Sequence, residues 1–289
     1  GIPTLTLGHA SRLLMPSGHS LLNVLPAGAG AAILGHASFL LAQADDCLCL
    51  PNLNLALQLW FGLGLFCSGL AHIFDLPGLY RKRECGALPS YIWLYLGSWL
   101  VLYRGVWFLK QDLALCGLKY KANDRMYDLI IPRLLLGRLT WTLPSWDGLP
   151  EVDMVIDLTC EWSEPWALRS VAHYIAVPVV DTTRPTVEQT LFAAWSAVEH
   201  MRDPDLGSVY IHCANGYGRS AVVAAAVLLL DGTCDTPAEA VARLKEARPV
   251  VTLRQQGNKA ICETVTHVEL LQAVLEKQTW ASSSSDSDD

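Results

Sequence analysis

The segment that most constrains this chain spans residues 209–230, where a short apolar stretch leads through a glycine-containing loop into a second apolar run. Val209-Tyr210-Ile211 consists of residues that favour β-strands, and residues 221–230 are all Ala, Val or Leu, as in a buried helix. A strand that turns tightly into a helix leaves backbone N–H groups unpaired at the helix start. Because these groups and the helix dipole attract negative charge, the segment predicts an anion-binding loop.

The loop carries side chains suited to chemistry on a bound phosphate. Cys213 and Arg219 are separated by five residues, and Ser220 follows the arginine. The pKa of a thiol, ordinarily ~8.5, can fall to ~3.5–7.5 at a helix start, and an arginine fork can bind two phosphate oxygens. A buried, inert cysteine followed by an ordinary arginine is the alternative interpretation. The expected phosphate-binding residues are Ala214, Asn215, Gly216, Tyr217, Gly218 and Arg219.

The pattern His-Cys-x-x-Gly-x-x-Arg-Ser resembles the signature loop of the cysteine-dependent protein tyrosine phosphatase superfamily, in its dual-specificity phosphatase branch. The resemblance covers about residues 127–275. It implies that Cys213 forms a phosphocysteine intermediate, that Arg219 binds the phosphoryl oxygens and that Ser220 helps the thiolate leave. Members of that branch often have Ala at the position of Asn215 and Ser at the position of Gly218, and neither position is essential to the mechanism.

The same resemblance implies further site residues outside the loop. Asp181 lies 32 residues before the cysteine, and in this family such an aspartate protonates the leaving oxygen and then activates water. His212 takes a supporting role, and Gln256 is a candidate for orienting water. Asp157 falls inside a predicted strand, so we expect it to be structural.

Strands and helices alternate through the second part of the chain. Strands are expected at 127–138, 152–158, 174–177 and 209–211, and helices at 185–201, 221–230, 237–247 and 254–277. Thr236, Pro237 and Glu239 resemble a helix start with a capping box. The sequence predicts an α/β catalytic domain over residues 120–278, with a central, mainly parallel sheet flanked by helices, followed by a disordered Ser/Asp tail at 279–289.

Residues 1–119 are predicted to form a hydrophobic helical region that anchors the chain to a membrane. Apolar runs at 21–42, 53–74 and 91–109 each approach the length that spans ~30 Å of hydrocarbon. A buried helical pair is the alternative for the first two runs. Arg104 and six aromatic residues in the third run favour a helix at the membrane surface. This organisation resembles a membrane-linked subgroup of dual-specificity-like phosphatases, in which a basic Leu-Pro loop, here 81–89, precedes the enzyme.

Basic residues indicate which side of the membrane the enzyme faces. Arg81-Lys82-Arg83 and the lysines after residue 109 should both lie in the cytosol. Two crossing helices, an interfacial third helix and a cytosolic catalytic domain satisfy both. Residues 120–289 have a net charge of −9, which with +2 in residues 1–119 gives the −7 of the chain. The acidic half argues against a nucleic-acid partner, and Asp153, Asp157, Glu161 and Glu164 are expected to form an acidic patch.

No cofactor or metal is expected. The nine cysteines are scattered singly except Cys47-x-Cys49, and no second pair or histidine stands at zinc spacing. An odd count without a regular framework is typical of reduced thiols in a cytosol-facing domain.

The substrate is left open between two classes. Phosphoproteins carrying phospho-Tyr, phospho-Ser or phospho-Thr are the family default. A phospholipid, such as a phosphoinositide or phosphatidylglycerophosphate, is favoured by a membrane anchor but disfavoured by the lack of a basic residue at 214–218. Two other interpretations are a phospho-binding pseudophosphatase and a lipid-phosphate hydrolase using His19, in Pro16-Ser17-Gly18-His19-Ser20, with His72.

Overall fold

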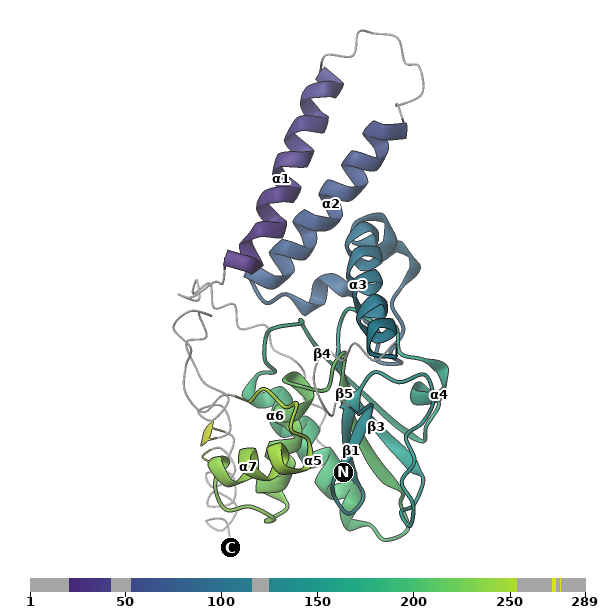
Figure 1. The fold of residues 1–289 in the computed structure, drawn as a ribbon, viewed down its shortest axis with the longest axis vertical. Helices are drawn as coiled ribbons and strands as arrows, with labels where there is room; N and C mark the ends of the chain where they lie inside the picture. Colours follow the sequence, from purple (N-terminus) through teal and green to yellow (C-terminus); the bar gives the residue numbers. More distant parts are fainter. Residues whose placement is uncertain (1–20, 43–52, 116–124, 254–271, 274–275, 277–289) are drawn as a thin grey trace, which may run out of the picture.

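A computed structural model describes residues 21–42, 53–115, 125–253, 272–273 and 276. Figure 1 shows a hairpin of two helices, α1 (Leu21–Ala42) and α2 (Leu53–Ile73), extending away from an α/β body. Both helices follow the predicted ranges to within one residue. Gly30 faces the backbone of Phe66 so closely that a Cβ would collide with it, which lets the two helices approach.

α2 is the one helix among the described residues whose length and apolar composition suffice to cross a membrane. Only 28% of its apolar window is buried inside the protein, so α2 is not a core helix of this chain. α1 contains a shorter apolar stretch, Val24–Leu40. The apolar character of the hairpin is therefore shown, whereas two crossings remain a prediction.

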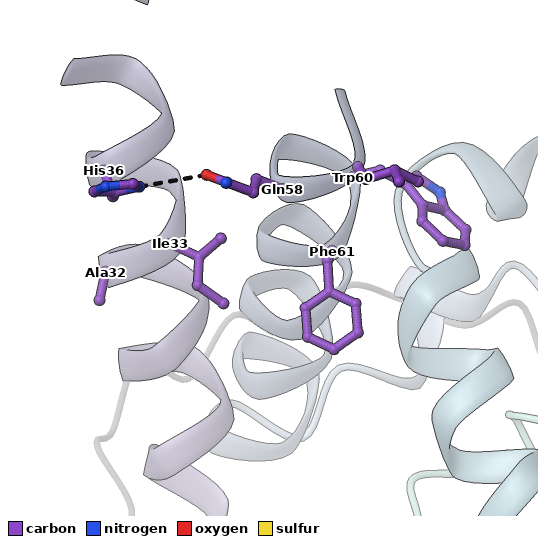
Figure 2. Close-up of a pocket in the computed structure, with 7 residues that line it drawn as sticks. Ala32, Ile33, His36, Gln58, Trp60 and Phe61 are labelled. Atoms are coloured by element: carbon purple, nitrogen blue, oxygen red, sulfur yellow. Dashed lines mark hydrogen bonds between the residues drawn. The ribbon is translucent and has the colours of Figure 1, made fainter. Parts of the chain in front are cut away.

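A hollow of about 630 Å³ lies between α1 and α2, and none of its lining residues belongs to the cysteine loop (Figure 2). Its polar members are His36 and Gln58, whose Nδ1 and Oε1 atoms are 3.3 Å apart. The Nδ1 atom of His72 lies 2.8 Å from the carbonyl oxygen of Ser68 in its own helix. Both histidines have partners within the helical region, and His19, the other histidine of the lipid-phosphate hydrolase interpretation, lies outside the described residues. The hollow is lined by Ala32, Ile33, His36, Leu57, Gln58, Trp60 and Phe61.

The third apolar run differs from the expected helix at 91–109. It divides into a 3₁₀ helix η2 (Ser90–Leu94), after η1 (Pro77–Tyr80), and a longer helix α3 (Gly97–Leu115). The guanidinium of Arg104 lies over the rings of Trp93 and Trp162 and donates to the carbonyl oxygen of Glu161 at 3.1 Å. The guanidinium of Arg104 thus contacts both η2 and the α/β body, although its Nε atom is buried without a hydrogen-bond partner.

Five strands form one sheet in the order β1-β2-β5-β3-β4. β2, β5, β3 and β4 run parallel, and β1 pairs antiparallel with β2. The expected entry strand at 127–138 is a hairpin instead, because Pro132 and Arg133 turn the chain, the latter with φ of 69°. The mainly parallel sheet is confirmed. Its strands are β1 (Tyr127–Ile131), β2 (Leu134–Arg138), β3 (Val152–Thr159), β4 (His173–Val179) and β5 (Ser208–Cys213).

Helices cover both faces of this sheet. α5 (Val187–Arg202), α6 (Arg219–Leu230) and α7 (Pro237–Ala247) pack on one face, and every residue of α6 is buried. α4 (Trp166–Arg169) and the middle of α3 contribute to the opposite face, where the core includes the aromatic residues Trp107, Trp162 and Tyr210. The predicted helix at 254–277 and the tail at 279–289 lie almost entirely outside the described residues.

The segment between α2 and α3 is bound to the sheet by a buried ion pair. The ammonium of Lys82 contacts the Oδ2 atom of Asp157 in β3, and both side chains are fully buried. Lys82 also donates to Thr159 at 2.8 Å, and Tyr174 donates to Asp157 at 2.7 Å. Asp157 is structural, as predicted, but Lys82 is not a free basic loop residue.

The expected acidic patch forms only in part, because Asp157 and Glu164 lie close together whereas Glu161 and Asp153 have partners elsewhere. Asp157, Glu161 and Glu164 are buried. Asp153 accepts from His200 at 2.6 Å, at the other end of β3. Burying a carboxylate without a cation is costly, so each has acquired a partner that is distant in sequence.

Replacing Lys82 with Met should lower the free energy of unfolding by about 3–5 kcal/mol, because the charge of Asp157 would remain buried without its cation. Denaturation of the full chain, followed by tryptophan fluorescence, measures this. The double variant Lys82→Met/Asp157→Asn should recover much of the loss, and Arg83→Met, at an exposed position next to Lys82, is the control. Equal losses in the single and double variants would contradict the role of the pair.

Candidate active site

The cysteine loop connects the end of β5 to the start of α6, as the sequence predicts. Cys213 is the last residue of β5 and Arg219 the first of α6. Gly216 has φ of 70°, a conformation that glycine adopts without strain. A Cβ at this position would collide with the backbone of Gly137 in β2. The loop therefore requires glycine at 216 for two independent reasons.

Five consecutive carbonyl groups of the loop accept hydrogen bonds from donors that are distant in sequence. The oxygen of Cys213 accepts from the amide of Leu139 at 2.9 Å, and that of Ala214 from the indole of Trp107 at 3.3 Å. The oxygens of Asn215 and Gly216 accept from Arg248 at 3.5 and 3.0 Å, and that of Tyr217 from the amide of Thr252 at 2.9 Å. Because the carbonyl groups are bound on the outside of the loop, its amide groups can point to the inside, where they can bind an anion.

The sulfur of Cys213 lies among hydrogen-bond donors on that inner side. The amide of Gly216 is 3.2 Å from Sγ, and the hydroxyl of Ser220 is 3.3 Å from it. Burial favours the neutral thiol, but the charge of Arg219 and the hydrogen bonds from Ser220 and the backbone outweigh it and lower the pKa of Cys213. The loop is built to hold a thiolate.

Arg219 is oriented by Glu161, a residue whose role the sequence did not reveal. Its two terminal nitrogens lie 3.0 and 2.8 Å from the two carboxylate oxygens of Glu161. Nη1 also donates to the carbonyl oxygen of Val179 at 2.8 Å. This planar two-point pairing fixes the guanidinium beside the sulfur. Glu161 follows the end of β3, which is the one signal that could have placed it near the loop.

Asp181 lies at the same edge of the sheet, two residues beyond the end of β4. Its Oδ1 atom is 2.9 Å from Nη2 of Arg219, and its side chain is 25% exposed. Burial raises the pKa of Asp181, but the charge of Arg219 and a hydrogen bond from Tyr103 lower it overall. The predicted acid and the predicted phosphate-binding arginine are thus in direct contact.

Helix α3 also reaches the site, which the sequence analysis missed. The hydroxyl of Tyr103 is 2.9 Å from Oδ2 of Asp181 and 3.3 Å from Oε1 of Glu161. Trp107, one turn further along, is the donor to the loop carbonyl of Ala214. In the sequence, Tyr103 and Trp107 are two of several aromatic residues in an apolar run. Such a run is also typical of a helix at a membrane interface, so the sequence did not indicate that either residue reaches the site.

His212 lies in a buried polar cluster behind the loop. Its Nε2 atom is 3.2 Å from Oε1 of Glu164, and burial and then the charge of Asp157 raise the pKa of Glu164 to about 7. One ligand atom from each of Asp157, Glu164 and His212 lies within 4.8 Å of the others, which is compatible with a metal ion. Because Lys82 already supplies a cation to Asp157, we interpret the cluster as an ion-pair network supporting the loop.

Arg248, directly after α7, connects the cysteine loop to another part of the sheet. It is fully buried, and besides the loop carbonyls its Nη1 atom contacts Asp128 of β1 at 2.6 Å. Arg248 therefore links the loop to the β1–β2 hairpin. Gln256, the candidate for orienting water, lies outside the described residues.

Residues 148–265 match the family model of the dual specificity phosphatase catalytic domain. The chain is similar to the crystal structure of Tk-PTP in the active form, with 25% identity, a TM-score of 0.40, and coverage of 53% of this chain and 97% of that one. It is also similar to human DUSP28, with 18% identity, a TM-score of 0.40 and coverage of 54% and 96%. PTPMT1 is a third similar structure, with 22% identity, a TM-score of 0.38 and coverage of 53% and 99%. No curated protein matches the chain significantly.

Replacing Ser220 with Ala should raise the pKa of Cys213 by about one to two units, since a hydrogen bond to an ionised group contributes ~1.5–3 kcal/mol and one pKa unit is ~1.4 kcal/mol. The pH dependence of Cys213 alkylation by iodoacetamide, followed by peptide mass spectrometry, measures this shift. Ser208→Ala is a matched control, because its hydroxyl donates to Pro150 at the other end of β5. An unchanged midpoint in the Ser220 variant would show that the hydroxyl does not stabilise the thiolate.

Proposed function

We propose that this chain hydrolyses phosphomonoesters through a phosphocysteine intermediate. Its residues 148–265 belong to the dual-specificity branch of the cysteine-dependent phosphatases. The observation that carries the proposal is the loop at 213–219. Its carbonyls are bound outside, its sulfur accepts from Gly216 and Ser220, and Arg219 is fixed beside it.

In the first step, the thiolate of Cys213 attacks phosphorus, a sulfur–phosphorus bond forms and the ester bond breaks. Loop amides and Arg219 bind the phosphoryl oxygens, where negative charge is concentrated. Asp181 gives its proton to the leaving oxygen, so the alcohol departs neutral. Arg219 must exchange Asp181 for the phosphoryl group as the substrate enters, and this exchange raises the pKa of Asp181 towards the protonated form that the step requires.

In the second step, water attacks the phosphocysteine. Asp181, now ionised, accepts a proton from that water as the oxygen–phosphorus bond forms. The sulfur–phosphorus bond breaks, inorganic phosphate leaves and the thiolate is restored. The hydrogen bond from Ser220 stabilises the departing sulfur.

The substrates that we propose first are phosphoproteins carrying phospho-Tyr, phospho-Ser or phospho-Thr, as for the dual-specificity branch. A phospholipid is the second candidate, supported by exposed apolar side chains on α3, the helix that carries Tyr103 to the site. The ring of Phe108 on α3 also stacks on exposed Trp141 of the α/β body. The exposed apolar side chains on α3 are Val101, Leu102, Val106, Phe108 and Leu109.

Membrane attachment through α1 and α2, with the catalytic residues in the cytosol, is part of the same proposal. It is supported by the exposed apolar surface of α2. The acidic charge of residues 120–289 favours neither nucleic acid nor anionic lipid as a surface that this half of the chain binds, so attachment is assigned to the helices alone. The site residues that we assign are Cys213, Arg219, Asp181, Ser220, His212 and the loop residues 214–218.

Replacing Cys213 with Ser should abolish turnover of every substrate, because a serine hydroxyl at this site cannot supply the nucleophile. The assay uses the full chain with phosphopeptides and with vesicles containing a phosphoinositide or phosphatidylglycerophosphate. Cys85→Ser, at an exposed cysteine, is the control. Retained turnover would contradict the cysteine mechanism and favour a histidine-dependent hydrolase, whereas an inactive wild-type chain that binds phosphopeptides would indicate a pseudophosphatase.

Replacing Asp181 with Ala should lower kcat by ~10²–10⁴ through loss of the general acid. Inorganic phosphate should bind at least as tightly as before, because the carboxylate that competes for Arg219 is removed. Steady-state rates and phosphate inhibition measure the two effects, and exposed Asp205→Ala is the control. Activity equal to wild type between pH 5 and 7 would place the acid elsewhere.

A further inference from the structure

Asp181 is bound on both carboxylate oxygens, and the two partners lie 78 residues before it and 38 residues after it in the sequence. Oδ1 lies 2.9 Å from Nη2 of Arg219, in the phosphatase loop. Oδ2 accepts from the hydroxyl of Tyr103 at 2.9 Å. Tyr103 lies on α3, well before the residues that match the phosphatase family. An apolar helix outside the matched region thus contributes a polar contact at the centre of the site.

We propose that Tyr103 is a positioning residue that orients Asp181 for proton transfer and determines which carboxylate oxygen carries the proton. The inference rests on the proposed role of Asp181 as general acid. A hydroxyl that donates to Oδ2 favours the neutral carboxyl group whose proton is on the other oxygen. That oxygen, Oδ1, faces Arg219 and therefore the place where a phosphoryl group binds.

The importance of Tyr103 follows from the exchange of partners during the reaction. A phosphoryl group that binds Arg219 displaces Asp181 from the guanidinium, which frees Oδ1. The hydroxyl of Tyr103 is then the side-chain contact that keeps Asp181 from rotating away from the leaving oxygen. Fixing a catalytic group in a reactive geometry accounts for a substantial part of enzymatic rate enhancement.

Packing holds the Tyr103 ring in place independently of its hydroxyl. The ring centroid lies 6.0 Å from that of Trp99 and 6.2 Å from that of Trp162. Trp107 anchors the next turn of α3 to the loop carbonyl of Ala214. At the start of α3, Ser98 donates to the carbonyl oxygen of Trp60 in α2 at 3.1 Å. A phenylalanine at 103 should therefore keep the ring contacts and lose only the hydrogen bond.

A purely structural role is the competing interpretation, because the same hydroxyl is 3.3 Å from Glu161, which orients Arg219. The two roles differ in their dependence on the leaving group. A misplaced general acid slows departure of a poor leaving group, which needs protonation, far more than departure of a good one. A distorted phosphate site would slow both equally.

The test compares Tyr103→Phe with wild type in the full chain, using 4-nitrophenyl phosphate as the good and phenyl phosphate as the poor leaving group. We measure kcat/KM, which reports the steps up to cleavage of the ester bond. The expected loss is about tenfold or more on phenyl phosphate, as for a hydrogen bond to a charged group. The loss on 4-nitrophenyl phosphate should be much smaller. Adding Tyr103→Phe to Asp181→Ala should cause no further loss on either substrate.

Tyr95→Phe is the matched control, since that hydroxyl lies in the same N-terminal region and donates at 2.6 Å to the carbonyl oxygen of Leu79 instead of to Asp181. It should leave the ratio of the two kcat/KM values unchanged. Equal losses on both substrates for Tyr103→Phe, or a further loss in the Asp181→Ala background, would overturn the positioning role. A leaving-group effect of Asp181→Ala without one for Tyr103→Phe would also overturn it, while leaving the proposed function intact. Turnover that survives Cys213→Ser would instead defeat the proposed function itself.

Discussion

The site depends on the outward orientation of five backbone carbonyls in the loop after β5. A loop that is free to turn its carbonyls inward would repel both a thiolate and a phosphate. Here the donors that prevent this come from the end of β2, from α3, from the end of α7 and from the segment after it. The short anion-binding loop is therefore assembled by much of the described chain, and substitutions far from it in sequence should affect the ionisation of Cys213.

The N-terminal helical region is not merely attached to the α/β body. Lys82 is buried against β3, Arg104 is bound beside Trp162, and Tyr103 and Trp107 contact the acid and the loop. Because α2 and α3 are joined by the hydrogen bond between Ser98 and Trp60, the apolar hairpin is physically continuous with the site. The predicted boundary at residue 120 separates Tyr103 from Asp181 in sequence, but the fold brings them together.

The local features of the site could be predicted from the sequence because they are encoded by neighbouring residues. The strand, the loop and the helix at 208–230 form one continuous segment, so the placement of Cys213 beside Arg219 and Ser220 followed from spacing alone. Glu161, Arg248, Tyr103 and Trp107 could not be found in this way, since their partners are 32 to 107 residues away. The predicted acidic patch forms only in part for the same reason: sequence proximity groups carboxylates, whereas folding places Glu161 and Asp153 against partners that are distant in sequence.

The most direct measurement traps the covalent intermediate. The full chain is mixed with a phosphorylated aryl substrate, quenched in acid during turnover, digested, and the peptide that contains Cys213 is examined by mass spectrometry. The thiolate mechanism predicts a phosphoryl group on the sulfur of Cys213, present during turnover and lost when the substrate is exhausted. Turnover with a phosphoryl group on a histidine, or with none on Cys213 when hydrolysis of the intermediate is slowed by low temperature, would contradict it.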